Sequence, residues 1–173
     1  MIPSPETPSP AWYAVHTRSR HERLVLEQLQ AAGYEVYLPE YWAWSRRRDR
    51  RKRIKKPLFP GYLFVRTAMS PELRLGIIKA RSVVRIVGAG KQPQPVPDRE
   101  IESIRRLMDV SSDAAPHPFL ASGRKVMVQD GPLAGVVGVV TGEKKKKIVV
   151  QVELLGRAVA ARLDACQLAP WLE

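Results

Sequence analysis

The stretch that decides the fold of the first half of the chain is KPLFPGYLFVRT, residues 56–67. Two prolines, Pro57 and Pro60, interrupt its apolar run, and the aromatic and aliphatic residues behind them predict a β-strand. Successive side chains of a strand point to opposite faces of the sheet, so Tyr62 and Phe64 share one face. Two interpretations of this aromatic face stay open: it is part of a buried core, or it is a surface on which another molecule docks.

Three further segments predict strands because they are short and rich in aromatic or β-branched residues. They are AWYAVHT (11–17), YEVYLPE (34–40) and SVVRIVG (82–88). Together with the strand at Tyr62, they give four predicted strands in one α/β unit.

The segment after the first strand predicts a helix that packs on this sheet. Ser19 and Glu22 have the Ser-x-x-Glu spacing of a capping box, and Gly33 can end the helix with a positive φ. The residues spaced for its apolar face are Leu24, Val25, Leu29 and Ala32.

Two later segments also predict helices. Ser70 and Pro71 suit the start of a short helix that runs to about Lys79, because the missing proline N–H would be unpaired there anyway. Asp98 can cap a longer helix. The apolar stripe of that helix consists of Ile101, Ile104, Leu107 and Met108.

The composition changes at residues 109–122, where serine, alanine and proline replace the periodic pattern and predict a linker. The valine-rich segments beyond it are short and broken by glycines, which favours a small β-barrel. The expected fold class is α+β, with helices flanking a sheet and a small barrel following it. The expected parts are a disordered tail (1–10), an α/β domain (11–110) with a basic arm (45–56), a linker (111–122) and the barrel domain (123–173).

Positive charge is concentrated in the arm. RRRDRRKRIKK, residues 46–56, holds nine basic residues and one acidic residue, a net +8 of the chain's +12. Such a run can be only a solvated loop. It also suits a polyanion, because each cation held at a phosphate releases counterions without reading a base. The arm lacks the pattern of an amphipathic helix, so we expect no membrane binding.

The residues that catalysis would need are scattered. His16, His21 and His117 have no cysteine or carboxylate cluster at metal-ligand spacing, and Cys166 is the only cysteine. We therefore expect no enzyme activity, no metal and no cofactor. No run approaches the roughly 18 apolar residues of a membrane span, so we expect a cytoplasmic protein.

Several motifs, in their order along nearly the whole chain, resemble the NusG family of transcription elongation factors. They are WYAVHTRSRHE, PLFPGYLFV, the region VVRIVG to PVPDREIESI, VMVQDGPLAGVVGVV, LLGR and LDACQL. The resemblance implies an N-terminal NGN domain, in which helices flank an antiparallel four-stranded sheet, and a C-terminal KOW domain of SH3-like barrel type.

In this family the NGN domain binds the clamp helices of the RNA polymerase largest subunit through an apolar depression, reaches toward the other large subunit and suppresses pausing. Leu73, Arg74 and Leu75 stand where specialised members carry a histidine-threonine-threonine contact to that second subunit. The resemblance assigns polymerase binding to His16, Phe59, Tyr62, Phe64, Ile101 and Ile104.

The resemblance also implies contacts with non-template or upstream DNA. The nucleic-acid residues expected at the first helix and before the fourth strand are Arg18, Arg20, His21 and Arg81. Those expected in the arm are Arg46, Arg47, Arg48, Arg50, Arg51 and Arg53. In the KOW domain, Leu154, Leu155 and Arg157 correspond to a site for a small-subunit ribosomal protein or Rho, although Leu155 replaces the usual aromatic residue.

PLFPGYLFV and the long arm are more similar to specialised paralogues, such as RfaH and the capsule-operon antiterminators, than to the housekeeping factor. We expect a monomeric antitermination factor. The alternative is a KOW-containing RNA-binding or ribosome-associated module that needs no polymerase.

Overall fold

The computed structural model describes residues 9–45, 52–117, 123–141, 147–163 and 168–171. The chain forms two compact units, Met1–Leu38 with Pro60–Pro97, and Pro39–Phe59 with Asp98–Glu173. Most of the expected N-terminal tail, residues 1–8, lies outside the described residues. The combination of helices, an antiparallel sheet and a β-rich C-terminal part confirms the predicted α+β class.

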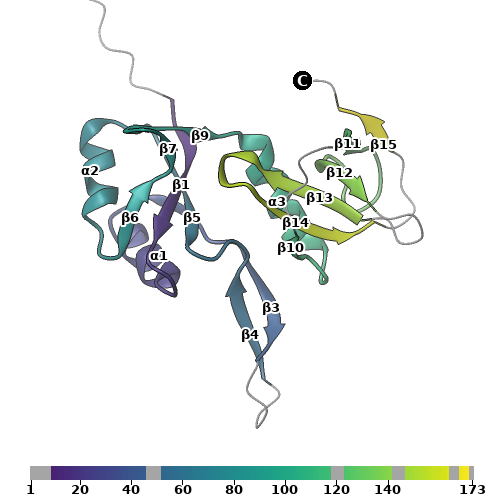
Figure 1. The fold of residues 1–173 in the computed structure, drawn as a ribbon, viewed down its shortest axis with the longest axis horizontal. Helices are drawn as coiled ribbons and strands as arrows, with labels where there is room; N and C mark the ends of the chain where they lie inside the picture. Colours follow the sequence, from purple (N-terminus) through teal and green to yellow (C-terminus); the bar gives the residue numbers. More distant parts are fainter. Residues whose placement is uncertain (1–8, 46–51, 118–122, 142–146, 164–167, 172–173) are drawn as a thin grey trace, which may run out of the picture. The chain divides into compact units, whose positions relative to one another are not determined.

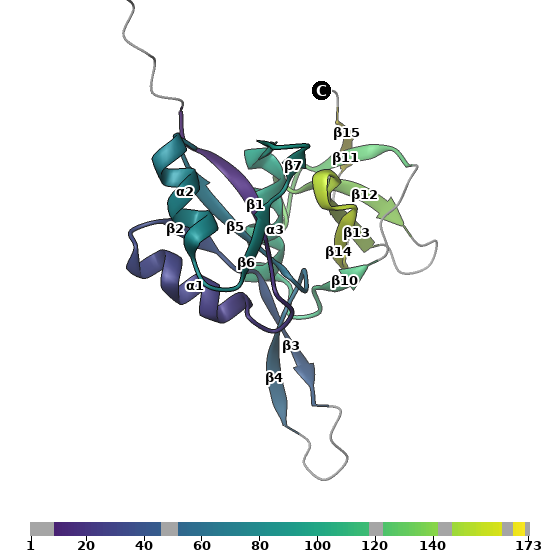
Figure 2. The ribbon, with the colours of Figure 1, turned by 60° about the vertical axis from the view of Figure 1, so that its left-hand side comes forward.

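The first unit is built on β1 (Ala11–Thr17), which lies between β5 (Tyr62–Thr67) and β6 (Val83–Ile86) in an antiparallel sheet (Figures 1 and 2). Strand β2 (Glu35–Tyr37) pairs with the free edge of β5. These are the four predicted strands, in the order β2-β5-β1-β6. The short strand β9 (Pro95–Val96) also pairs with β1, and β7 (Gly88–Ala89) and β8 (Gln92–Pro93) form a separate small hairpin.

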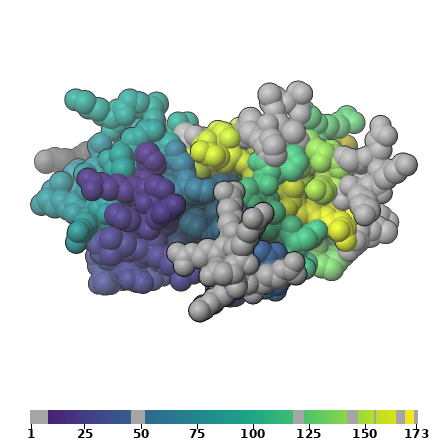
Figure 3. All heavy atoms as spheres, turned by 60° about the horizontal axis from the view of Figure 1, so that its bottom comes forward, coloured from purple at the N-terminus to yellow at the C-terminus, as the bar shows by residue number. Residues whose placement is uncertain are grey.

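Helices α1 (Glu22–Ala31) and α2 (Pro71–Lys79) belong to the first unit, and α1 lies at its surface (purple in Figure 3). The apolar core of this unit contains side chains from both helices and from one face of the sheet. Its buried members are Val15, Val25, Leu29, Leu63, Val65 and Ile77. Leu63 and Val65 therefore lie on the core face, as the strand alternation predicts.

The structure confirms the predicted start of α2, because the Ser70 hydroxyl accepts a hydrogen bond from the backbone N–H of Leu73 (3.3 Å). The predicted capping box of α1 is wrong. His21 occupies the N-cap position and makes no side-chain cap bond, and the Glu22 carboxylate accepts a hydrogen bond from the backbone N–H of Gly61 (2.7 Å) instead. The predicted apolar face also shifts, since Leu24 is exposed.

The second unit contains a two-stranded ribbon formed by β3 (Glu40–Trp44) and β4 (Arg53–Pro57). The sequence predicted only a basic arm here, and the structure shows that both flanks of the arm pair as an antiparallel hairpin. Residues 46–51, which connect the two strands, lie outside the described residues.

The C-terminal part of the second unit is a six-stranded antiparallel sheet with the order β10-β14-β13-β12-β11-β15. Its strands are β10 (Ala115–His117), β11 (Lys125–Val128), β12 (Val137–Thr141), β13 (Lys147–Val152), β14 (Arg157–Arg162) and β15 (Leu168–Pro170). Strand β10 lies within the segment that was expected to be a linker, and it pairs with β14. Gly138 permits close strand packing, because a Cβ there would lie 2.5 Å from the carbonyl oxygen of Val149.

Helix α3 (Asp98–Val110) packs against β12 and β13 of its own unit. The Ser103 hydroxyl accepts a hydrogen bond from the backbone N–H of Val137 (3.2 Å), and the Arg106 guanidinium donates to the carbonyl of Ala134. These two polar contacts attach the helix to the C-terminal sheet.

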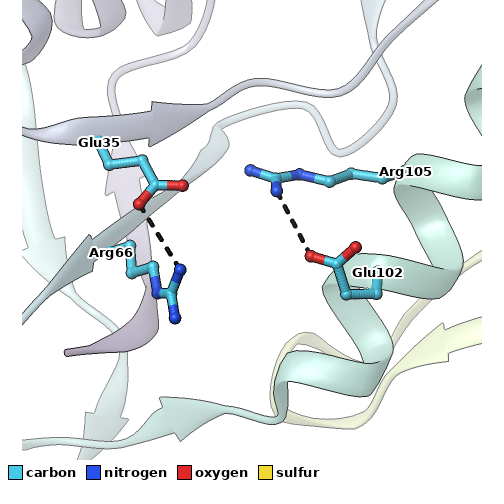
Figure 4. A network of polar contacts seen from close by, with 4 residues as sticks. All are labelled: Glu35, Arg66, Glu102 and Arg105. Carbon is cyan, nitrogen blue, oxygen red and sulfur yellow. Dashed lines mark hydrogen bonds and ion pairs between the residues drawn. The ribbon is translucent and has the colours of Figure 1, made fainter. Parts of the chain in front are cut away.

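Figure 4 shows two ion pairs, one between the neighbouring strands β2 and β5 and one within helix α3. Glu35 and Arg66 are directly opposite on β2 and β5, with 3.9 Å between their charged atoms. Glu102 and Arg105 form an i,i+3 pair at 3.4 Å along α3. Exposed pairs of this kind contribute little to stability, about 0–1 kcal/mol.

Candidate functional site

The face of the N-terminal sheet opposite its apolar core is aromatic. Trp12, His16, Tyr62 and Phe64 lie on this face, because the register pairs His16 with Tyr62 and Ala14 with Phe64. Tyr37 of β2 joins them, with its ring 6.5 Å from Trp12 and 6.4 Å from Phe64 between centroids. The strand alternation therefore gathers these five side chains on one face.

One end of this face is partly accessible, and Tyr37 on β2 is also half-buried. Trp12 and Phe64 are fully buried, whereas His16 and Tyr62 are half-buried and stack on each other with 5.0 Å between ring centroids. The Nδ1 atom of His16 is buried, and it has no hydrogen-bond partner among the described residues. The stacked pair thus offers a partly accessible aromatic surface.

The other residues expected to bind polymerase are buried. Phe59 belongs to the second unit and is 1% exposed, and Ile101 and Ile104 of α3 are 0% exposed. These side chains do not form an accessible surface in this structure. Their assignment to a docking surface stays a prediction.

The structure brings the predicted nucleic-acid residues of α1 and β6 together. The His21 Nδ1 atom shares a hydrogen bond with the Ser82 hydroxyl (2.7 Å), although the two residues are 61 positions apart. The backbone N–H of Arg18 donates to the carbonyl of Ser82 (2.9 Å), and the backbone N–H of Arg81 donates to the Gln28 side chain (3.0 Å). These contacts place Ser82 beside the beginning of α1 and Arg81 beside Gln28, in the second half of the helix.

The side chains of Arg18, Arg20 and Arg81 are exposed, and His21 is half-buried. Backbone N–H groups at the beginning of a helix, together with the helix dipole, favour an anion. The cluster is therefore suited to contact a phosphate backbone, and its two segments come from distant parts of the sequence.

The predicted basic arm is only partly described. Arg46, Arg47, Arg48, Arg50 and Arg51 lie outside the described residues. Arg53 lies on β4 and is exposed, with its guanidinium carbon 5.7 Å from the centroid of the Trp42 ring. The described part of the arm is thus a β-ribbon that carries cations beside an aromatic side chain.

The predicted site in the C-terminal unit lies in the turn between β13 and β14. Leu155 ends a short 3₁₀ helix (Glu153–Leu155), Gly156 has a φ of 57°, and Arg157 begins β14 with an exposed side chain. The side chain of Leu154 is not among those described. Glycine adopts this left-handed backbone conformation without a steric penalty, so Gly156 suits the turn from β13 into β14.

Helix α2 carries an exposed apolar surface that the sequence analysis did not identify as a site. Leu73, Leu75 and Ile78 are exposed. A depression of about 360 Å³ is lined by Met69, Pro71, Arg74, Leu75, Ile78 and Pro93. Leu75 and Ile78 are three residues apart and so lie on the same side of the helix, and this i, i+3 apolar pair was the signal available in the sequence.

An acidic side chain with a perturbed pKa lies where α3 meets the C-terminal sheet. Burial, reinforced by the neighbouring carboxylate of Glu153, raises the pKa of Glu100 to about 7 against the opposing effect of Lys125 and Arg99. Its Oε2 atom is buried without a hydrogen-bond partner among the described residues. Such a carboxyl group can couple the packing of α3 to pH.

No cluster of three or more histidine, cysteine, aspartate or glutamate side chains suited to a metal ion is found within the described ranges. In the same ranges, none of the helices is both long enough and apolar enough to span a bilayer.

Comparison with known proteins identifies the class. The family model described as "Transcription termination factor nusG" matches residues 10–105. The chain is 31% identical to the transcription termination/antitermination protein NusG of Pseudomonas aeruginosa over 170 residues, which cover 90% of this chain and 96% of that protein. It is 29% identical to the protein of that name from Escherichia coli (strain K12) over 178 residues, covering 94% and 97%.

A solved structure of domain interaction in Thermotoga maritima NusG matches with a TM-score of 0.54 and 26% identity, covering 90% of this chain and 93% of that one. These proteins are transcription factors and not enzymes, which defines the class of the present protein. The chain belongs to the NusG family.

Proposed function

We propose that this chain is a transcription elongation and antitermination factor that binds the clamp helices of the RNA polymerase largest subunit and suppresses pausing or termination. The observation that carries the proposal is the stacked pair His16–Tyr62 at the accessible end of the aromatic face. Partly exposed aromatic side chains are typical anchors of a protein interface.

The basic cluster of Arg18, Arg20, His21 and Arg81 supports a second contact, with upstream or non-template DNA. Arg18, Arg20 and His21 lie at the beginning of α1, which suits phosphate, and Ser82 connects them to the segment that carries Arg81. The exposed apolar surface of α2 is suited to the other large subunit of polymerase, in place of the polar contact found in specialised paralogues.

Within the family we place the chain among the specialised antitermination factors, because its arm has a net charge of +8. A phosphate-binding arm strengthens attachment to nucleic acid. Rho or a small-subunit ribosomal protein would bind at the turn formed by Leu155 and Arg157.

The test is the affinity of the full chain for isolated clamp helices. Replacing His16 and Tyr62 together with alanine should weaken binding about 30-fold or more, since an aromatic anchor contributes about 2 kcal/mol. Tyr13→Ala is the matched control, because Tyr13 lies on β1 but on the opposite face. Equal loss in both variants, or unchanged affinity in a folded double variant, contradicts the docking assignment.

A purified transcription assay tests the function itself. The parental chain should bind polymerase and shorten pauses, and the double variant should lose both effects. Binding to RNA without any binding to polymerase would favour the alternative, a KOW-containing RNA-binding or ribosome-associated module.

A further inference from the structure

The β3–β4 ribbon carries two large aromatic side chains at its surface. Trp42 is 54% exposed and Trp44 is 63% exposed. They are two positions apart on β3, so both indoles lie on the same face. The views in Figures 1 and 2 show this ribbon standing clear of the six-stranded sheet of its own unit.

The opposite strand places cations beside these indoles. Trp42 is directly across from Lys55, and Trp44 is directly across from Arg53. The Lys55 ammonium lies 5.4 Å and the Arg53 guanidinium carbon 5.7 Å from the centroid of the Trp42 ring. These cation–π contacts help to hold the two strands together. They do not cover the indoles, more than half of whose surface stays accessible.

We propose that this face, formed by Trp42, Trp44, Arg53 and Lys55, binds unpaired nucleotides by stacking their bases on the indoles. Residues two apart on a strand are separated by about 7 Å, and stacked bases rise about 3.4 Å each. One base fits between the two indoles at that spacing. Its phosphate then lies within reach of the cations across the ribbon.

The chemistry of the face favours single-stranded nucleic acid over a duplex. Base faces in a duplex are already stacked on their neighbours, whereas an unpaired base presents its π-face to an aromatic side chain. Every base has such a face, so the ribbon would bind with little sequence preference.

The charge of β4 favours nucleic acid over a protein partner. Lys52, Arg53, Lys55 and Lys56 follow one another closely in this strand region, and three of the four are lysines. Lysine is depleted in the cores of protein–protein interfaces, while aromatic side chains set among cations are typical of surfaces that track a single strand.

This inference rests on the proposed function in one respect only, which is where the unpaired nucleic acid comes from, because transcription exposes unpaired DNA and RNA. The proposed contact also differs from the one expected of the arm, because the indoles bind bases, whereas the arginines of the arm bind phosphates. The binding test uses no polymerase, so its failure and a failure of clamp binding are separate results.

The experiment measures the affinity of the full chain for labelled 15-nucleotide oligomers of thymidine and of uridine by fluorescence anisotropy. Replacing Trp42 and Trp44 together with alanine should weaken binding about tenfold or more, within the usual effect of losing base–aromatic stacking. Replacing both with phenylalanine should restore most of the affinity. Ile54→Ala is the matched control, because Ile54 is exposed on the opposite face of the same ribbon.

An abasic oligomer of equal length separates stacking from phosphate contact. The parental chain and the double alanine variant should bind it equally, and their salt dependence on the base-bearing oligomers should be the same, because the cations are retained. Preference for the thymidine or the uridine oligomer identifies DNA or RNA as the source of the strand.

Two results overturn the proposal. The first is unchanged affinity of the folded alanine variant for the base-bearing oligomers. The second is an equal loss on the abasic oligomer, which would mean that the indoles only support the ribbon.

Discussion

The carboxylate of Glu22, in the first turn of α1, accepts a hydrogen bond from the backbone N–H of Gly61, 39 residues away, across 2.7 Å. Gly61 precedes β5 with a φ of 83°, and its carbonyl accepts a hydrogen bond from the backbone N–H of Thr17 (2.8 Å). A Cβ at Gly61 would lie 3.7 Å from the His16 ring. The carboxylate therefore fixes the turn that leads into the strand carrying Tyr62.

Glu22→Ala should destabilise the protein by about 1.5–3 kcal/mol, because it leaves a buried backbone N–H without its charged acceptor. Urea denaturation measures this change. Glu27→Ala is the matched control on the same helix, and it should change stability by less than about 0.5 kcal/mol, since Glu27 is exposed. Equal effects of the two substitutions would show that the bond to Gly61 adds nothing.

The case of Glu22 also shows what the sequence could and could not predict. The period-2 pattern predicted β1 and β5, and the side chains of Leu63 and Val65 lie in the core as expected. The capping-box spacing is a local signal, and it failed because the helix begins at Glu22, whose carboxylate accepts a hydrogen bond from the distant backbone N–H of Gly61. Contacts of that range depend on the tertiary fold and leave no local pattern.

The ribbon was missed for a related reason. Nine of the eleven residues at 46–56 are basic, which hides the alternation of polar and apolar residues that is typical of a strand. The sequence therefore predicted only a basic arm there. Two-stranded ribbons gain their stability from cross-strand pairs, such as Trp42 with Lys55, and these pairs are known only when the register is known. The proximity of Arg81 to Arg18 likewise depends on the contacts of Ser82.

Glu100 predicts a pH dependence of stability. Its pKa is raised to about 7 in the folded protein, so the folded state holds this proton more tightly than the unfolded state, whose pKa is 4.5. As pH rises from about 4.5 to about 7, the unfolded state loses the proton first, and the contribution of this group to stability falls. Above about pH 7, the contribution of Glu100 to stability is fully lost.

Glu100→Gln should therefore raise the melting temperature at pH 8 relative to the parental chain and reduce the difference between pH 5 and pH 8. The groups that face Glu100 are Glu153, Lys125 and Arg99, and all three are retained in this variant. Glu102→Gln, at an exposed position of the same helix, is the control and should leave the difference unchanged. Parallel melting curves for Glu100→Gln and the parental chain at both pH values would contradict this assignment.

The arm should determine how strongly nucleic-acid binding depends on salt. Six arginines are replaced with glutamine in this variant: Arg46, Arg47, Arg48, Arg50, Arg51 and Arg53. If all six contact phosphates of a single strand, the slope of log K against log salt should flatten by about four. Titrations of one oligomer at several salt concentrations measure the slope. A variant with the parental slope would show that the arm is a solvated loop.

The last prediction concerns α3, which the sequence assigned to the N-terminal domain (11–110) and which the structure joins to β12 and β13 of the second unit. Ser103 and Arg106 provide its polar contacts with that sheet, to Val137 and Ala134. Replacing both side chains with alanine should speed hydrogen exchange of the α3 amides about tenfold or more, since each lost hydrogen bond costs about 1 kcal/mol. The helix should open locally before the whole protein unfolds.

The matched control for this variant removes the ion pair of Glu102 and Arg105, which lies along α3 and is drawn in Figure 4. Both residues are replaced with alanine, so the number of truncated side chains and their place on the helix are similar. An exposed i,i+3 pair contributes only about 0.2–0.5 kcal/mol, and exchange should change little. If the Ser103 and Arg106 variant exchanges no faster than this control, α3 is held by contacts other than those with the C-terminal sheet. A fragment of residues 10–110 would then keep a fully protected α3, as expected for an independent N-terminal domain.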